Sequence, residues 1–312
     1  MPLDYESWTR TRKLYDPEEL GQRMKKEGTT ILVVEADFIF EEVFQQAKDL
    51  GFLGVCRSSL NHVDLDAATR HDVLVVNTPW RNARAVAELA IALMLSLARR
   101  VPSLDSYVKE GHWQDPVEGY ISYRGIELQG STLGLVGLGG VGRIVSKLGR
   151  ALGMEVLAYD PYAGQLGQRK SGSLLVPLDR VLEESRFLSL HTPFSAETMG
   201  LIGERELGMM RKGAYLINTA FYGMVDEPAL VKHLSSGYLA GAALDVHDAH
   251  PIPSSSPLLK LSNVILTPHI GGATVETIDR HSTMMLQDIQ RYLHGVKPRH
   301  LANPKAWTAR GH

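Results

Sequence analysis

The chain has 312 residues, of which 44% are apolar, and this suffices for about two domains with buried cores. A formal net charge of −2, with no long charged run, argues against nucleic acid or a membrane surface as a partner. The start MPLDYESWTR lacks a secretory apolar core, and the longest apolar stretch is too short to span a bilayer. The single Cys56 excludes an internal disulfide. We therefore expect a cytoplasmic protein.

The first eighty residues alternate between helix and strand patterns. Asp16-Pro17 is a start signal for a helix over 15–26. A further helix is expected over 40–50, and short apolar runs predict strands at 30–34, 51–56 and 73–76. This alternation predicts a first, smaller α/β domain with a parallel sheet.

A long helix is predicted over 83–100. It is apolar almost all round between 86 and 98, so it must be buried, either between domains or subunits or inside one core. Residues 101–130 are rich in glycine and aromatic residues and predict an irregular arm that crosses into a second domain.

The rest of the chain is organised around the stretch 131–160, which reads as strand, glycine turn, helix, strand and acid. In the turn, Gly137 permits a tight bend, Gly139 lets the backbone approach a pyrophosphate, and Gly142 lets the helix pack closely on the sheet. The helix start favours the negative charge of the pyrophosphate. Asp160, 18 residues after Gly142, can accept hydrogen bonds from ribose hydroxyls, and it favours NAD over NADP because it would repel a 2′-phosphate.

Four later predicted strands each end in a polar residue. The predicted strands are 187–190, 214–218, 240–244 and 264–266, and the residues at their ends are His191, Thr219, Asp245 and His269. Before the first of them we expect a short strand at 174–176 and a helix at 178–184, and between and after them helices at 204–210, 226–234 and 276–293. Ligands in open α/β sheets lie beyond the carboxyl ends of the strands, so these four residues are site candidates.

These residues and their surroundings resemble the D-isomer-specific 2-hydroxyacid dehydrogenases. The matching segments are NTPWRNARAVAELAIALML, LHTPFSAETMGLI, LINTAFYGMVDEPAL, GAALDV and ILTPHIGGAT. The resemblance implies an α/β protein whose Rossmann-type, doubly wound NAD domain (108–275) is inserted into a smaller, flavodoxin-like catalytic domain (1–107 and 276–312). It also implies NAD as cofactor, a small hydroxy or keto acid as substrate and a homodimer built on the NAD domains.

The family mechanism uses a histidine, a glutamate and an arginine, and only the histidine is present here. His269 stands in TPHIGG, whereas the arginine position is Phe221 and the glutamate position is His250. Losing the glutamate removes the acid that would keep His269 protonated, and a second histidine lowers its proton affinity by like-charge repulsion. Arg57 is the first candidate to replace the arginine.

Weaker alternatives also stand. Arg81 and Arg84 are further candidates for holding a substrate carboxylate, and Asp248 could orient His269 if its loop bends. A metal cluster of imidazole and carboxylate ligands is a minor alternative, although its spacing fits no metal motif. Its members would be His247, Asp248, His250 and His269.

The cofactor contacts implied by the resemblance are better preserved. Besides the glycines of the turn, they comprise Gly140, Val141, Asp160, His191, Pro193, Thr219, Ala220, Phe221, Asp245, His269 and Gly271. The first hypothesis is therefore an NAD-dependent oxidoreductase with an altered active site, in which His269 is the acid/base. The second is an NAD(H)-binding sensor or partner-binding protein with little or no dehydrogenase activity.

Overall fold

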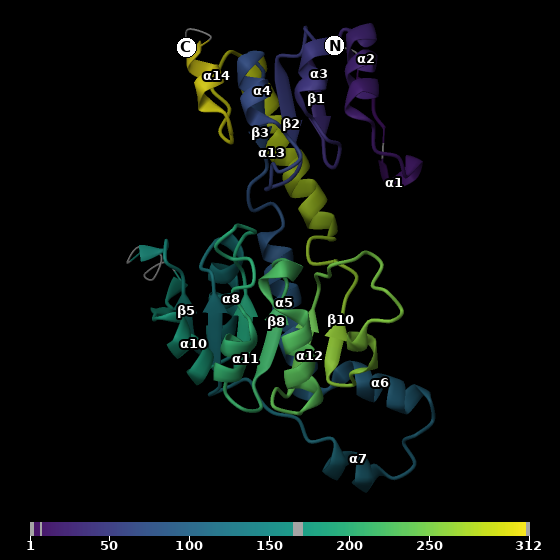
Figure 1. Ribbon diagram of the computed structural model, residues 1–312, viewed down its shortest axis with the longest axis vertical. Helices are drawn as coiled ribbons and strands as arrows, with labels where there is room; N and C mark the ends of the chain where they lie inside the picture. The colour runs from purple at the N-terminus through teal and green to yellow at the C-terminus, as the bar shows by residue number, and fades with distance from the viewer. Residues whose placement is uncertain (1–2, 7, 165–170, 310–312) are drawn as a thin grey trace. The chain divides into compact units, whose positions relative to one another are not determined.

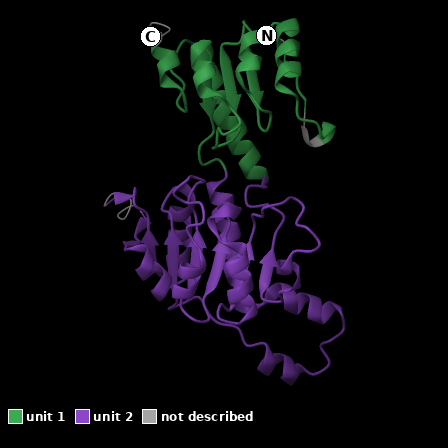
Figure 2. Ribbon diagram, viewed as in Figure 1, with its two compact units in different colours: residues 1–81, 275–312 green, residues 82–274 purple. Residues whose placement is uncertain are grey.

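The computed structural model describes residues 3–6, 8–164 and 171–309. The chain forms two compact units, residues 1–81 with 275–312 and residues 82–274 (Figure 2). The first division falls at 81/82, whereas the sequence placed a domain boundary at 107/108. The reason is that the helix α5 (Ala83–Arg99) packs against α8, β8 and β9 of the larger unit. The second division, at 274/275, lies within one residue of the predicted position.

The smaller unit contains a three-stranded parallel sheet in the order β1-β2-β3 (Figure 1). Its strands are β1 (Ile31–Val34), β2 (Phe52–Val55) and β3 (Leu74–Asn77). Its helices are α1 (Trp8–Thr11), α2 (Pro17–Glu27), α3 (Glu41–Gln46), α4 (Leu65–Arg70), α13 (Val275–Leu293) and α14 (Pro304–Ala309). As predicted, α2 starts at Asp16, whose carboxylate accepts from the backbone N–H groups of Glu18 and Glu19.

The larger unit contains a seven-stranded parallel sheet in the order β10-β9-β8-β7-β4-β5-β6. Its strands are β4 (Thr132–Val136), β5 (Glu155–Tyr159), β6 (Leu174–Leu175), β7 (Phe187–Leu190), β8 (Tyr215–Asn218), β9 (Gly241–Leu244) and β10 (Val264–Leu266). From β6 to β9 this is the Rossmann order 3-2-1-4-5-6, with β10 added at the edge. The predicted doubly wound α/β fold is confirmed, and the strand order reverses between β4 and β7.

Helices cover both faces of the larger sheet. On one face α5 and α8 (Gly140–Ala151) pack over Leu133, Leu135 and Phe187. On the other face, Val136 and Leu188 meet a second layer of helices. That layer consists of α10 (Leu178–Glu184), α11 (Glu204–Met209) and α12 (Glu227–Ser235), with the short turns η1 (Tyr222–Met224) and η2 (Pro257–Lys260) beside it. Neighbouring residues in the strands point to opposite faces, and both faces are buried, so the strands read as continuous apolar runs.

The structure adds helices where the sequence suggested an irregular arm. The segment 101–130 contains α6 (Val101–Lys109) and α7 (Pro116–Ser122). The expectation of an irregular arm was wrong because local start signals outweigh the glycine content: Pro116 occupies the first turn of α7, and Asp115 caps it by accepting from the N–H of Val117. The sequence analysis also passed over α4, which Asp64 caps in the same way. Within the described ranges, no helix is both long and apolar enough to cross a membrane.

Candidate functional site

The glycine turn joins β4 to α8, and its three glycines differ in backbone conformation and in the space around them. Gly137 has φ 100°, in the left-handed region that other residues rarely adopt. A Cβ atom on Gly142 would lie 2.0 Å from the carbonyl oxygen of Gly137, so no larger residue fits there. A Cβ on Gly139 would meet nothing within 4 Å. The first and third glycines are thus required by the fold, whereas the space at Gly139 is open to a ligand.

Asp160 lies at the end of β5, beside this turn. One carboxylate oxygen, Oδ2, accepts from the N–H of Leu138 at 2.7 Å, and the other, Oδ1, accepts from the N–H of Tyr162 at 2.8 Å. The acid is therefore fixed against the glycine turn by two backbone contacts. Gly140 and Val141 begin α8 next to it, and their N–H groups belong to the first turn of the helix, where no partner within the helix exists.

Two buried polar side chains follow the neighbouring strands β7 and β8. Leu190 pairs with Asn218 in the register of these strands, so His191 and Thr219 come directly after a matched pair. Among the described residues, neither ring nitrogen of His191 nor the hydroxyl of Thr219 has a hydrogen-bond partner. Burial lowers the pKa of His191 to about 3, which keeps its imidazole neutral. Orphaned buried polar atoms at the carboxyl edge of the sheet are what a bound ligand would satisfy.

Asp245, at the end of β9, anchors the segment that carries His269. Its Oδ1 accepts from the hydroxyl of Thr267 at 2.6 Å and from the N–H of Ile270 at 2.9 Å, and its Oδ2 accepts from the N–H of Gly271 at 2.8 Å. The side chain is 1% exposed. These three contacts hold the backbone on both sides of His269, which itself has φ 56°. Left-handed backbone in a residue other than glycine is costly and persists where its surroundings fix it.

The structure brings His250 and His269 together. The Nδ1 atom of His269 lies 3.3 Å from the Nε2 atom of His250, and the ring centroids are 5.4 Å apart. Both residues are exposed. His250 precedes a cis peptide bond to Pro251. The neighbouring His247 instead donates through Nε2 to the carbonyl oxygen of Thr267 at 2.8 Å.

Phe221 follows β8 and forms part of an apolar wall. Its ring meets Phe194 edge to face, with centroids 5.5 Å apart and planes at 85°. Its carbonyl oxygen accepts from the side chain of Asn218 at 2.9 Å, which fixes the backbone of the turn. Phe194 was not predicted as a site residue, because the contact joins two loops that follow different strands. Its only signal in the sequence was an aromatic residue directly after His191-Thr192-Pro193, and the structure shows that this residue is exposed.

The three arginine candidates differ in what they contact. Arg57 lies in the smaller unit after β2 and is exposed, and in the described ranges its guanidinium forms no hydrogen bond or ion pair. Arg81 pairs with Glu35 at 2.9 Å, and Arg84 pairs with Glu88 at 2.5 Å. Of the three arginines, Arg57 is therefore the one whose guanidinium has no hydrogen bond or ion pair to a described residue.

The minor alternative of a metal cluster gains no support. Over the residues that the structure describes, no group of three or more histidine, cysteine, aspartate or glutamate side chains is arranged to hold a metal ion. Asp248 does not join the histidine pair through a hydrogen bond or ion pair in this part of the chain, and its side chain lines a separate cavity.

Comparisons with known proteins point to one family. Residues 91–271 match the family described as "D-isomer specific 2-hydroxyacid dehydrogenase, NAD binding domain". A D-3-phosphoglycerate dehydrogenase of Archaeoglobus fulgidus is 39% identical over 92% of this chain, and the match spans about half (53%) of that relative's length. A glyoxylate reductase of Korarchaeum cryptofilum is 36% identical over 91% of this chain and 86% of its own.

Solved structures give the same result. The TT0316 protein of Thermus thermophilus superposes with a TM-score of 0.82 at 35% identity, covering 95% of this chain and 96% of that one. A D-isomer specific 2-hydroxyacid dehydrogenase of Lactobacillus delbrueckii, solved in an NAD-complexed form, gives a TM-score of 0.77 at 29% identity, covering 88% of this chain and 87% of that one.

Proposed function

Because this chain belongs to the D-isomer specific 2-hydroxyacid dehydrogenase family, we propose that it is an NAD(H)-dependent oxidoreductase with an altered active site. Its substrate is a 2-hydroxy or 2-keto acid or a sugar-derived acid. The observation that carries the proposal is the contact between His269 and His250 at the carboxyl edge of the larger sheet.

Three features support the binding of a cofactor: the glycine turn after β4, the carboxylate of Asp160, and the buried side-chain atoms of His191 and Thr219 that have no hydrogen-bond partner among the described residues. The N–H groups of Gly140 and Val141 bind the pyrophosphate beside the open space at Gly139. Asp160 accepts from the adenine ribose and selects NAD over NADP by charge repulsion. The other contacts proposed for the cofactor are Gly137, Gly142, His191, Pro193, Thr219, Ala220, Phe221, Asp245, His269 and Gly271. When bound, the nicotinamide accepts or supplies the hydride.

His269 takes the hydroxyl proton during oxidation and returns it during reduction. The contact with His250 requires that one of the facing nitrogens carries a proton and that the other presents a lone pair. The pair can therefore be neutral or carry one positive charge, and a second charge would place two N–H groups against each other. His250 fixes the orientation of the catalytic ring, as a glutamate would, but it has no negative charge and therefore stabilises the protonated form of His269 less than a glutamate would.

The aromatic wall points to a substrate different from the smallest keto acids. Phe221 and Phe194 present ring surface where the family places a cation, so the substrate carries an apolar group on this side. Arg57 holds the carboxylate in this proposal, since its guanidinium is uncommitted among the described residues. Such a charge-assisted contact contributes about 1.5–3 kcal/mol.

The test is NADH oxidation against a panel of 2-keto acids and keto sugar acids. The natural protein is compared with the double variant Phe221→Arg, His250→Glu and with His269→Ala. Activity of the natural protein on one substrate, changed in the double variant and abolished in His269→Ala, supports a re-specialised dehydrogenase. A turnover rate that His269→Ala leaves unchanged contradicts the role given to this histidine.

A second candidate function is an NAD(H)-binding protein that senses the cofactor or binds a partner without turning over substrate. The substitutions Phe221 and His250 favour it, because both replace charged groups of the family mechanism. It predicts micromolar binding of NADH with no turnover on any substrate of the panel, and activity that appears only in the double variant. A good substrate for the natural protein would end this candidate.

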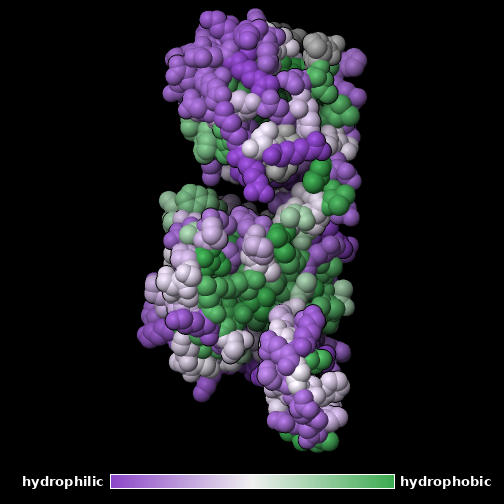
Figure 3. Space-filling model, turned by 90° about the vertical axis from the view of Figure 1, so that its right-hand side faces the viewer, coloured by the Kyte–Doolittle hydropathy of each residue, from purple (hydrophilic) through white to green (hydrophobic). Residues whose placement is uncertain are grey.

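We also propose that the protein is a homodimer joined through its larger unit. Apolar side chains more than half exposed lie along α6, α7 and the segment between them, among them Val101, Trp113, Val117 and Ile121. Figure 3 shows apolar residues gathered over a broad area of the larger unit beside this segment. Exposed apolar surface of this kind marks an interaction site. Sedimentation of the wild type and of the double variant Trp113→Glu, Val117→Glu tests the dimer. We expect the double variant to be a monomer, and a monomeric wild type would contradict the proposal.

A further inference from the structure

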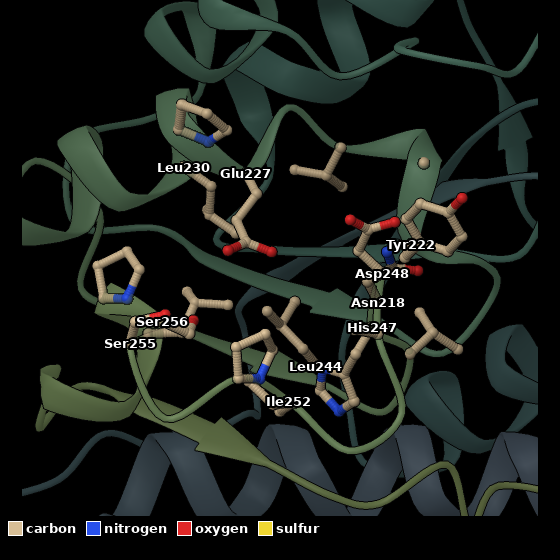
Figure 4. Close-up of a pocket in the computed structure, with 18 residues that line it drawn as sticks. Asn218, Tyr222, Glu227, Leu230, Leu244, His247, Asp248, Ile252, Ser255 and Ser256 are labelled. Atoms are coloured by element: carbon tan, nitrogen blue, oxygen red, sulfur yellow. The ribbon is translucent and has the colours of Figure 1, made fainter.

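The larger unit contains a cavity of about 500 Å³ that the proposed chemistry does not use (Figure 4). It lies beyond the ends of β8 and β9, between the start of α12 and the loop of residues 246–258. Neither histidine of the pair lines it, nor does any residue of the glycine turn. It is therefore separate from the proposed cofactor site.

The charges that line the cavity are negative. Glu227, in the first turn of α12, and Asp248, on the loop, contribute carboxylates to its wall (Figure 4), and none of its eighteen lining residues is lysine or arginine. Among the described residues, neither carboxylate takes part in a hydrogen bond or an ion pair. Glu227 is only partly exposed, so a cation beside it would be screened less than at the open surface.

Two further groups in the wall are suited to a hydrogen-bond donor. The Nε2–H group of His247 donates to the carbonyl oxygen of Thr267, so the Nδ1 atom of the neutral ring presents a lone pair. The hydroxyl oxygen of Ser256 is buried and has no partner within the described part of the chain. The base of the cavity is apolar and is formed by the buried side chains of Leu230, Leu244 and Leu258.

We propose that this cavity is a second ligand site, which takes a small aliphatic amine. Each carboxylate pairs with an ammonium group of the amine, the acceptors take N–H groups that remain, and the leucines contact the hydrocarbon chain. An anion is excluded by the two carboxylates. A purely apolar molecule would leave the carboxylates and the Ser256 hydroxyl desolvated without partners, which is costly.

The test uses two probes with the same five-carbon chain, 1,5-diaminopentane with charged ammonium ends and 1,5-pentanediol with neutral hydroxyl ends, in calorimetric titrations of the whole protein at low salt. We expect the diamine to bind with one molecule per chain and the diol to bind at least tenfold more weakly. The double variant Glu227→Gln, Asp248→Asn should lose at least tenfold in affinity for the diamine. Glu183→Gln, which removes an exposed acid on α10 away from the cavity, is the matched control and should bind as the wild type does.

A steric variant keeps the test independent of charge and of folding. Ser255 is exposed and lines the cavity, so Ser255→Trp should block the cavity and abolish diamine binding without changing the melting temperature. Equal binding of the diamine and the diol would overturn the proposal. Diamine binding retained in both the double variant and Ser255→Trp would also overturn it, because the amine would then bind elsewhere. Neither readout depends on dehydrogenase activity.

Discussion

His250 Nε2 lies 3.3 Å from His269 Nδ1, so two side chains 19 residues apart in the sequence form one hydrogen-bonded pair. The backbone around His269 is fixed by Asp245, whereas His250 reaches it from the loop after β9. The orientation of the proposed acid/base thus depends on a second group that can itself carry a proton. This dependence gives the first prediction.

Replacing His250 by alanine should lower kcat about tenfold, since one hydrogen bond of about 1.4 kcal/mol would no longer orient His269. The dissociation constant of NADH should stay unchanged. Steady-state kinetics and fluorescence titration with NADH measure the two quantities. An unchanged kcat would show that the contact does not orient the reacting ring.

Replacing His250 by glutamate should shift the pH dependence of reduction. A carboxylate beside His269 raises the pKa of that histidine relative to the natural protein. Reduction needs the protonated ring, so the pH at which the reduction rate has fallen by half should move upward. pH–rate profiles of the two proteins test this, and a shift to lower pH would contradict the assignment.

The glycine turn separates folding from cofactor binding. Gly142→Ala places a Cβ 2.0 Å from the carbonyl oxygen of Gly137 and should lower the free energy of unfolding by about 1–3 kcal/mol, the usual cost of overpacking. Gly139→Ala meets nothing in the protein and should leave the melting temperature unchanged while weakening NADH binding at least tenfold. Thermal melts and NADH titrations of both variants decide this. Equal effects on both quantities would contradict the division of roles.

Asp160 should govern the choice between the two nicotinamide dinucleotides. Asp160→Asn removes the negative charge and keeps one acceptor oxygen, so one of the two N–H groups that donate to Asp160, those of Leu138 and Tyr162, loses its acceptor. We expect weaker binding of NADH and stronger binding of NADPH, because the repulsion of the 2′-phosphate is gone. Titrations with both cofactors measure the ratio of dissociation constants. A ratio equal to that of the natural protein would remove Asp160 from the ribose site.

Stability should fall in mild acid because of His191. Its pKa is lowered from 6.5 to about 3 in the fold, so below pH 6.5 the unfolded chain binds a proton that the folded chain excludes. The free energy of unfolding is therefore lost as pH falls from 6.5 towards 3. His191→Gln does not titrate, so its melting temperature should drop less than that of the wild type between pH 7 and pH 5. His71 and Arg70 lower the pKa of Glu41 to about 2. The stability that Glu41 contributes is therefore lost only at lower pH, between 4.5 and 2.

Much of the fold followed from local patterns. The glycine turn, the apolar strands and the polar residue after each strand were sufficient to predict the order of β4, the glycine turn, α8, β5 and Asp160 within the stretch 131–160. These features depend on short-range chemistry: turns need left-handed backbone, and buried parallel strands need unbroken apolar runs. The helix α7 was missed because the glycine and aromatic content of 101–130 was given more weight than its start signal at Asp115 and Pro116.

The sequence by itself determined the Rossmann topology and the membership of a dehydrogenase family, because both depend on residue identity and spacing. The substitution of two catalytic positions, Phe221 and His250, stays a prediction from the sequence. Only the tertiary structure decided which side chains meet. In the structure His250 contacts His269, and the ring of Phe194 packs against that of Phe221. Arg81 forms an ion pair with Glu35, and Asp248 lines a cavity instead of contacting the histidines. Those contacts join loops that follow different strands or helices, and the positions of such loops are set by the packing of the whole sheet rather than by any local pattern.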